Sequence, residues 1–256
     1  MATRPLGKKA SARAPTAVSA APAFRPHLVH VESDAGGVDR GLSLRQGAPV
    51  RSSPLREAVN RGVDLTGALA IGVLLLPLFA VIALLLSLQG GPVIYRHRRI
   101  GRDGKPFDCL KFRSMYLDAA RRLHELFARH PELEAEWLRD HKLRDDPRIT
   151  GVGRLLRRTS LDELPQLWNV LRGEMSLVGP RPIVREETIR YGRQMKAYVT
   201  VRPGITGLWQ VTGRNNTDYR RRVVLDVYYV RHRSLRLDLT ILLKTIWVVV
   251  RGDGAY

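Results

Sequence analysis

Cysteine is almost absent from this chain of 256 residues, in which Cys109 is the single example. One cysteine excludes an intramolecular disulfide framework, and we expect Cys109 to be a small buried hydrophobic side chain. No Cys or His falls in a C-x-x-C or H-E-x-x-H pattern, so a structural zinc site is not expected. Internal repeats are absent too, and with 44% hydrophobic residues the chain is neither a solenoid nor disordered throughout.

Acidic residues are scarce: 24 Asp and Glu stand against 43 Lys and Arg, which gives a formal net charge of +19. An excess of this size points to an anionic partner. Nucleic acid is the obvious partner for so basic a protein. However, the basic residues follow Gly and Pro turns instead of lining one helix or alternating with aromatic residues. Nucleic-acid binding also leaves a long apolar run unexplained, and we therefore exclude it.

Charge is missing altogether from Leu65 to Leu88, a run of 24 mostly apolar residues. A run of more than about 18 such residues predicts a membrane helix. It begins too late in the chain and is too long for a secretory signal peptide. Residues 1–55 before it are rich in Ala, Pro, Ser, Gly and Arg and predict a disordered basic tail. We divide the chain into this tail, a membrane helix at residues 56–90 and a polar domain at residues 91–256.

Pro77 lies near the middle of the apolar run, where it removes a backbone hydrogen bond and kinks the helix. Each half then spans only about 18 Å, short of the roughly 30 Å hydrocarbon core of a bilayer. Arginines flank both ends of the run, and Lys and Arg mark the cytoplasmic side of a membrane. We expect a re-entrant helix that bends at Pro77 and leaves on the face where it entered. A kinked spanning helix stays open as the alternative, because Pro is tolerated in such helices.

The polar domain predicts an α+β fold with a small sheet and amphipathic helices at the membrane interface. Alternating residues on either side of Gly101–Gly104 predict a β-hairpin, and the LWQV segment at 208–211 predicts a further strand. Helices are expected over 116–143 with a break at Pro131, over 218–231 and over 235–250. The last of these is strongly apolar, which fits either a membrane surface or the core.

Asp162 and Glu163 stand out in the segment TSLDELPQLWNVLRG at 159–173. Ser160 and Glu163 match a capping box, with Asp162 as the alternative N-cap because Pro165 fits only in a first turn. Apolar residues at helical spacing follow up to the terminating Gly173.

Acidic residues in a first turn usually serve only to stabilise the helix. These two, however, lie among cations in Gly- and Pro-marked segments: Lys111, Arg113, Arg154, Arg157, Arg158, Arg181, Arg202 and Arg214. Two carboxylates among several cations are what a Mg²⁺-dependent reaction on a phosphate ester requires. The cations hold phosphate oxygens, and the carboxylates serve as metal ligands or as nucleophile. Glycines in RPGITG (202–207) could also bring N–H groups close to a phosphate.

Five motifs in order resemble those of the bacterial sugar transferase family, the monotopic phosphoglycosyl transferases. They are GPVIYRHRRIG, KFRSM, TSLDELPQLWNVLRGEMSLVGPRP, RPGITGLWQVTGRN and LDVYYVRHRSLRLDL, and the likeness runs from about Arg61 to Tyr256. The resemblance implies that residues 91–256 are a catalytic domain and that the apolar helix is broken at a proline and returns to the cytoplasmic face.

For the reaction, the resemblance implies transfer of hexose-1-phosphate from a UDP-sugar to undecaprenyl or another polyprenyl phosphate, with release of UMP. Asp162 is the expected nucleophile, which forms an aspartyl sugar-phosphate, and Glu163 is its partner, with both as ligands of Mg²⁺. The expected phosphate-binding residues are Lys111, Arg113, Arg157, Arg181, Arg202 and Arg214. Asp226, in LDVYYV, is a weaker candidate for a polar role in the site.

The resemblance also implies a bacterial inner membrane protein whose catalytic domain is cytoplasmic and which starts an exopolysaccharide or glycan. Galactose and glucose are the favoured sugars, and anionic lipids are expected partners of the basic surface. Oligomeric state stays open. Two alternatives remain beside this function: a non-catalytic membrane scaffold of a polysaccharide assembly complex, and a transferase that moves the sugar alone and releases UDP.

Overall fold

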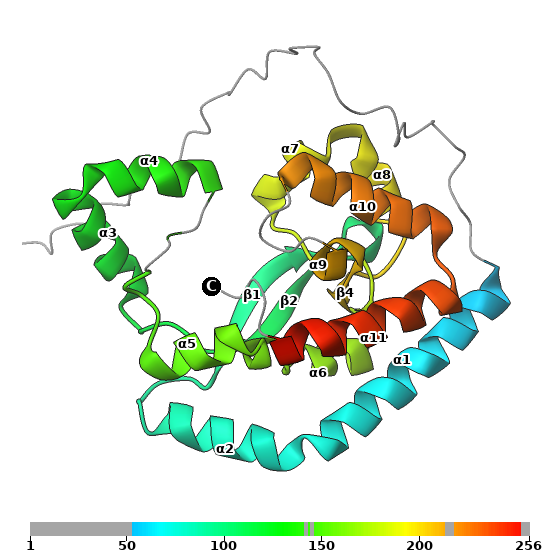
Figure 1. The fold of residues 1–256 in the computed structure, drawn as a ribbon, viewed down its shortest axis with the longest axis horizontal. Helices are drawn as coiled ribbons and strands as arrows, with labels where there is room; N and C mark the ends of the chain where they lie inside the picture. Colours follow the sequence, from blue (N-terminus) through cyan, green and yellow to red (C-terminus); the bar gives the residue numbers. More distant parts are fainter. Residues whose placement is uncertain (1–52, 141–142, 144–145, 213–217, 252–256) are drawn as a thin grey trace, which may run out of the picture. The chain divides into compact units, whose positions relative to one another are not determined.

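The computed structural model describes residues 53–140, 143, 146–212 and 218–251 (Figure 1). Nearly all of the predicted basic tail, and Arg214, lie outside these residues. The helices are α1(Pro54–Leu74), α2(Leu76–Ser87), α3(Ala119–Arg129), α4(Pro131–Asp140), α5(Gly151–Arg158), α6(Gln166–Arg172), α7(Thr188–Tyr191), α8(Met195–Tyr198), α9(Leu208–Thr212), α10(Tyr219–His232) and α11(Leu235–Arg251). The strands are β1(Ile94–Ile100), β2(Pro106–Phe112), β3(Ser176–Val178) and β4(Gly204–Thr206). The predicted mixture of helices with little sheet is confirmed, although the described strands form two small sheets instead of one.

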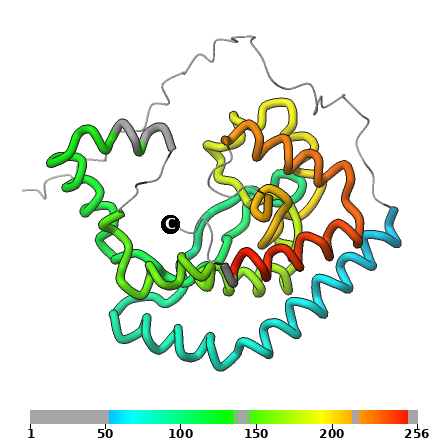
Figure 2. Tube along the Cα trace, viewed as in Figure 1, coloured from blue at the N-terminus to red at the C-terminus, as the bar shows by residue number. Residues whose placement is uncertain are grey.

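The apolar run forms a bent pair of helices, α1 and α2, which Figure 2 follows along the chain. The two helices meet at Leu75 with a bend of 63°, and Pro77 lies in the first turn of α2. A proline is tolerated there because the first turn of a helix has no N–H bond to lose. Within the described residues, no single helix has the length and apolarity to cross a membrane, whereas this pair has both when taken together. The break predicted at Pro77 is confirmed.

The start of α1 is bound to the polar domain by two charged side chains. Arg61 donates to the last carbonyl oxygens of α6, those of Val170 and Leu171, at 2.6 and 3.0 Å. Asp64 accepts hydrogen bonds across to β3, from the hydroxyl of Ser176 at 2.8 Å and from the N–H of Leu177 at 2.9 Å. The first half of the apolar pair is therefore attached to the elements that follow the Asp162–Glu163 segment.

The end of α2 is bound to the same domain. Arg113, immediately after β2, donates from Nη2 to the carbonyl oxygen of Leu86 at 3.0 Å. Ile82 and Leu86 are buried against Phe112 and Leu156, which come from β2 and α5. Both ends of the bent pair thus contact one body, while its middle carries exposed Leu and Val side chains.

β1 and β2 form the predicted hairpin, antiparallel and in a register that pairs Tyr95 with Lys111 and Arg99 with Phe107. Because side chains alternate along a strand, Phe107, Cys109 and Lys111 project from one face of β2. The turn at 101–104 holds Asp103 and Gly104 at positive φ, as a tight reversal requires. The hairpin prediction is confirmed.

β3 and β4 form a short parallel pair. A Cβ at Gly204 would overlap the backbone of Gly179, and one at Gly179 would come within 2.7 Å of the backbone of Arg202. These glycines allow two chain segments to approach each other closely, a role that we did not predict from the sequence. The strand predicted at 208–211 is wrong, since these residues form the helix α9 directly after Gly207. Four residues are too few for an alternating pattern to distinguish a strand from a helical turn.

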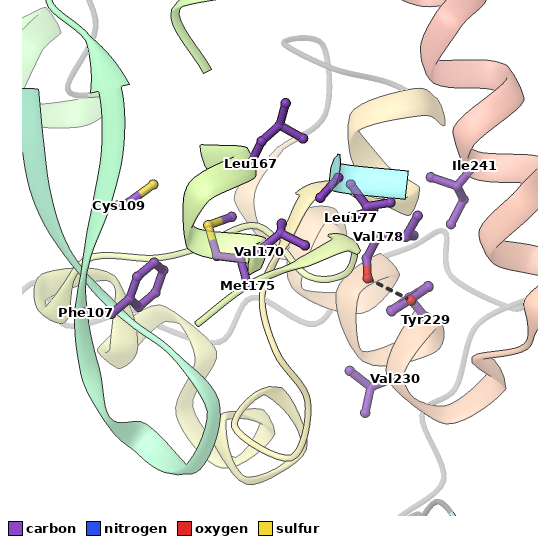
Figure 3. Close-up of a cluster of buried hydrophobic side chains, with 11 residues drawn as sticks. Phe107, Cys109, Leu167, Val170, Met175, Leu177, Val178, Tyr229, Val230 and Ile241 are labelled. Atoms are coloured by element: carbon purple, nitrogen blue, oxygen red, sulfur yellow. Dashed lines mark hydrogen bonds between the residues drawn. The ribbon is translucent and has the colours of Figure 1, made fainter. Parts of the chain in front are cut away.

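The main core is drawn in Figure 3, with side chains from β2, α6, β3, α10 and α11. Cys109 is 1% exposed, which confirms its predicted burial. Tyr229 donates its hydroxyl to the carbonyl oxygen of Val178 inside this cluster, at 3.1 Å. Leu167 and Val170 provide the buried face of α6, whereas Trp168, one of the apolar residues at helical spacing, is 54% exposed.

α11 packs in the core on one side only, so its prediction as a core helix is confirmed and the membrane-surface alternative stays a prediction. Ile241 is buried in the core cluster, while Leu239, Leu243 and Ile246 are about 60% exposed on the opposite side. The helix therefore has apolar residues on two sides, one of them packed and the other uncovered. This second side is an exposed apolar surface of the kind that marks an interaction with a protein or a membrane.

Candidate active site

Asp162 and Glu163, the dyad, lie in a short 3-10 turn at Leu161–Glu163, between α5 and α6. Ser160 precedes it in the left-handed conformation, φ 58°, and its side chain makes no capping hydrogen bond. α6 begins only at Gln166, behind Pro165, again without a side-chain cap. Both capping predictions are therefore wrong, because the proline sets the helix start after the dyad. The two carboxylates are directed to other partners, and Asp162 is only 8% exposed.

Lys111 lies between the two carboxylates of the dyad. Its Nζ donates to Glu163 Oε1 at 2.6 Å and lies 3.7 Å from Asp162 Oδ2. Arg181, in the loop after β3, places Nη1 at 3.7 Å from the same oxygen of Glu163. Three segments far apart in the chain, those of Lys111, the dyad and Arg181, thus meet at one point. This arrangement agrees with the predicted grouping of Lys111 and Arg181 with the dyad.

The two carboxyl groups differ in acidity. Burial raises the pKa of Asp162; Lys111 opposes this effect and the charge of Glu163 adds to it, which leaves the pKa above its ordinary value. For Glu163, burial also raises the pKa, but Lys111 and Arg181 outweigh it and hold the pKa below its ordinary range. Adjacent carboxyls whose pKa values are pushed apart are typical of sites where the two groups have different tasks.

Arg157 approaches the dyad from α5. Its Nε donates to the hydroxyl of Ser114 at 2.9 Å, and its charge lowers the pKa of Asp162. Burial lowers the pKa of Arg157 itself, but a guanidinium stays charged at neutral pH. α5 comes this close because Gly153 has no Cβ: one there would overlap the carbonyl group of Ser114. The predicted association of Arg157 with the dyad agrees with this placement.

Arg99, on β1, is a site residue that sequence reasoning missed. Together with Lys111, Glu163 and Arg181 it lines a cavity of about 10 Å³, room for one water molecule. Arg99 donates to the carbonyl oxygen of Pro182 at 3.1 Å, and so supports the loop that carries Arg181. A signal existed, because the hairpin register pairs Arg99 with Phe107 and puts its side chain on the face shared with Lys111.

Arg113 and Arg202, two other predicted phosphate-binding residues, are engaged away from the dyad. Arg113 is buried and bound to the end of α2, as described above. Arg202 donates to the carbonyl oxygen of Gly173 at 2.8 Å and to Glu57 at 3.4 Å. Each arginine ties a helix to the domain through a carbonyl oxygen at a helix end. Their assignment to phosphate binding stays a prediction.

Asp226, the weaker candidate, is fully buried on α10 and accepts a hydrogen bond from the hydroxyl of Tyr191 at 2.7 Å. Burial raises the pKa of Asp226 to about 8, although Tyr191 and the charge of Arg181 lower it. Its side-chain partner belongs to α7, and the backbone of Arg181 also lowers its pKa. Asp226 thus lies in a buried cluster that contacts the Arg181 loop, and its polar role in the site stays a prediction.

The dyad offers two carboxylates to a metal ion. No group of three or more His, Cys, Asp or Glu side chains in the described part of the chain could hold a metal ion. Mg²⁺, however, commonly takes only one or two carboxylates and completes its shell with water and substrate phosphate oxygens. Asp162 and Glu163 therefore fit Mg²⁺ in that form, bound together with a phosphorylated substrate.

Residues 55–252 match the family described as bacterial sugar transferase. The chain is 51% identical over 198 residues to a Salmonella typhimurium protein named undecaprenyl-phosphate galactose phosphotransferase, an alignment covering 77% of this chain and 42% of that protein. It is 46% identical over 204 residues to exopolysaccharide production protein ExoY of Sinorhizobium fredii, covering 79% of this chain and 90% of that protein. A Caulobacter vibrioides UDP-glucose:undecaprenyl-phosphate glucose-1-phosphate transferase is 37% identical over 235 residues, covering 87% and 81%.

The chain belongs to the bacterial sugar transferase family, as its five motifs indicated. It spans about two fifths of the length of the first relatives it matches, such as the Salmonella protein, and most of the length of ExoY.

Proposed function

We propose that this protein transfers hexose-1-phosphate from a UDP-hexose to undecaprenyl or a related polyprenyl phosphate, with release of UMP. The observation that carries the proposal is the buried Asp162–Glu163 pair, held by Lys111 and Arg181 in a member of the bacterial sugar transferase family. The names of the relatives favour galactose or glucose as the sugar and the start of exopolysaccharide assembly as the setting.

In this proposal Asp162 is the nucleophile. One carboxylate oxygen attacks the β-phosphorus of the UDP-hexose and forms an aspartyl–phosphorus bond, while the bond from that phosphorus to the bridging oxygen breaks and UMP leaves with this oxygen. An oxygen of polyprenyl phosphate then attacks the same phosphorus and releases the carboxylate of Asp162. The raised pKa of Asp162 supports this role, because a more basic carboxylate is the better nucleophile.

The cations of the site supply the electrostatic part of the reaction. A carboxylate and a diphosphate repel each other, and fixed positive charge near the developing phosphoryl oxygens lowers that barrier. Lys111 compensates the charge of the dyad, while Arg157 and Arg181 are placed to bind phosphate oxygens. Glu163 stays ionised, which suits it to hold Mg²⁺. Mg²⁺, when bound with the substrate, would neutralise charge on the diphosphate.

The acceptor is a membrane lipid, so the proposal places the protein on the cytoplasmic face of a bacterial inner membrane, with α1 and α2 as a re-entrant pair. The 63° bend and the attachment of both ends of the pair to the polar domain support this course over a spanning one. The exposed apolar side of α11 and the net charge of +19 suit a surface that meets acyl chains and anionic headgroups.

The test of function is the identity of the released nucleotide. The purified full chain is incubated with Mg²⁺ and a panel of UDP-hexoses, with and without undecaprenyl phosphate. We expect UMP and a lipid-linked hexose, and with donor alone a protein adduct of hexose phosphate by mass spectrometry. Asp162→Asn should lose UMP release by roughly 10⁴-fold or more. UDP in place of UMP would mean transfer of the sugar alone, and absence of both nucleotides with every hexose would overturn the proposal.

A matched control is Asp108→Asn, the same chemical change on β2. Asp108 pairs with Arg98 on the side of the hairpin away from Lys111, and its side chain is 44% exposed. We expect it to keep wild-type activity. An Asp162→Asn variant that releases no UMP and still complements a deletion strain would instead favour the scaffold alternative.

The membrane course has its own test. In a chain carrying Cys109→Ala, Arg56→Cys and Arg98→Cys are labelled separately with a membrane-impermeant reagent, from outside intact cells and after permeabilisation. A re-entrant pair predicts labelling of both only after permeabilisation. Labelling of Arg56→Cys in intact cells, with Arg98→Cys protected, would establish a spanning helix.

A further inference from the structure

Asn169 is the most completely buried polar side chain near the dyad, and the proposed reaction gives it no task. It lies on α6 with 0% exposure, two turns after Glu163. A buried side-chain amide is costly unless its donors and acceptor are paired, so its partners indicate what it does.

The partners of Asn169 are the backbone of β2. Its Oδ1 accepts from the N–H of Leu110 at 3.0 Å, and its Nδ2 donates to the carbonyl oxygen of Asp108 at 2.8 Å. A third bond runs from Nδ2 to Glu174 Oε2 at 2.6 Å. The amide therefore uses its acceptor and both of its donors.

The two bonds to β2 fall on an edge that none of the described strands covers. Among these strands β2 pairs with β1 alone, and backbone groups of alternate residues, here Asp108 and Leu110, point away from that partner. One amide that accepts from residue 110 and donates to residue 108 reproduces the hydrogen bonds of a neighbouring strand. The amide fixes the position of α6 along the length of β2 as well as the distance between them, since a shift of β2 by one residue would break both bonds.

The position of the strand along α6 decides where Lys111 meets the dyad. Lys111 directly follows Leu110, and only Leu164 and Pro165 separate the dyad from the start of α6. Phe107 and Cys109 pack on α6 residues of the core, but apolar contacts are not directional and do not set a register. Among the described side chains, Asn169 makes the directional contact, two hydrogen bonds, between α6 and β2.

We propose that Asn169 is a positioning residue, which holds the strand bearing Lys111 in register against α6, the helix that follows the dyad. The inference rests on the proposed function, since it assigns Asn169 to the same reaction. It touches neither substrate nor the reacting atoms, and acts through the placement of Lys111 between Asp162 and Glu163.

The experiment measures kcat and KM of the full chain with the UDP-hexose that supports UMP release. Asn169→Ala should lower kcat by about 100-fold, the cost of a displacement near 1 Å in a catalytic group, with little change in KM. Val170→Ala is the matched control: Val170 is the next residue and equally buried, and its truncation removes core packing without removing a side-chain hydrogen bond to β2. We expect it to lose stability while keeping kcat.

A double-mutant cycle with Lys111→Ala tests the route of the effect. If Asn169 acts by placing Lys111, then Asn169→Ala has little further effect on kcat once Lys111 is gone. Full loss in both backgrounds, or wild-type kcat in Asn169→Ala, overturns the inference. Equal loss of kcat in Val170→Ala also overturns it, because the effect then belongs to the core.

A second variant keeps the test sound if Asn169→Ala does not fold. Asn169→Asp retains the acceptor for Leu110 but loses the donors, and sets a carboxylate against Glu174. Combining it with Glu174→Gln restores one donated bond and should restore folding. The lost bond to Asp108 should still leave kcat low, and recovery of wild-type kcat would overturn the inference. Absence of UMP release by the wild-type chain would instead remove the proposed function itself.

Discussion

Asp64→Ala offers a quantitative test of how α1 is attached. The Asp64 carboxylate accepts bonds from the Ser176 hydroxyl at 2.8 Å and the Leu177 N–H at 2.9 Å, and these two residues are 5% and 7% exposed. Truncation leaves both donors buried without a partner, at about 1–3 kcal/mol each. Relief from burying the carboxylate offsets part of this cost, so we expect a net loss of about 2–4 kcal/mol. For a domain of this size the loss lowers Tm by roughly 5–15 °C.

The assay is thermal unfolding of the full chain in one detergent, followed by tryptophan fluorescence. Asp64→Asn is the control, since its amide oxygen can still accept both bonds and the expected loss is under about 1 kcal/mol. Asp64→Ala within about 0.5 kcal/mol of the wild type would refute the reasoning. An equal loss in both variants would assign the effect to charge and not to the two acceptor contacts.

Three further outcomes are expected. Gly153→Ala places a methyl group against the carbonyl of Ser114 and should cost about 1–3 kcal/mol, whereas Gly151→Ala, with open space around it in the same helix, should be neutral or slightly stabilising in the same unfolding assay. Arg61→Met removes both bonds to the α6 carbonyl oxygens and should lower Tm in detergent by several degrees; an unchanged Tm would show that α1 docks through apolar contacts alone. Asp226, with its pKa raised to about 8, binds a proton more tightly in the folded than in the unfolded state, so its contribution to stability is fully present below the ordinary pKa of an aspartate and is lost as pH rises toward 8. Asp226→Asn should remove that slope, and parallel Tm–pH curves for the two proteins would contradict the assignment.

Local patterns in the sequence predicted the local structure well. The charge-free run with Pro77, the hairpin around Gly101–Gly104 and the helix stop at Gly173 each follow from one residue type with a strong backbone preference. The predicted break, hairpin and stop are all present in the structure.

Sequence patterns that are compatible with two kinds of local structure led to wrong predictions. Ser160 and Glu163 have capping-box spacing, but Pro165 between the dyad and α6 moved the helix start. The LWQV segment alternates like a strand and yet forms α9, because four residues carry too little periodicity.

The basic residues show what composition leaves open. Lys111, Arg157 and Arg181 reach the dyad, whereas Arg113 and Arg202 hold helix ends, although all five occur in similar Gly- and Pro-marked segments. Arg99 reaches the site and was not expected there. A guanidinium serves either purpose equally well, so its partner depends on which segments the fold brings within reach.

By itself the sequence determined the apolar pair with its break, the excess of positive charge and the presence of a carboxylate pair within family motifs. Each of these is a property of neighbouring residues. Only the tertiary structure decided that Lys111 lies between Asp162 and Glu163, that Asn169 completes the free edge of β2, and that both ends of the apolar pair return to one body. These contacts join residues tens of positions apart, and directional hydrogen bonds across such separations follow from the packing of the whole chain and not from any local pattern.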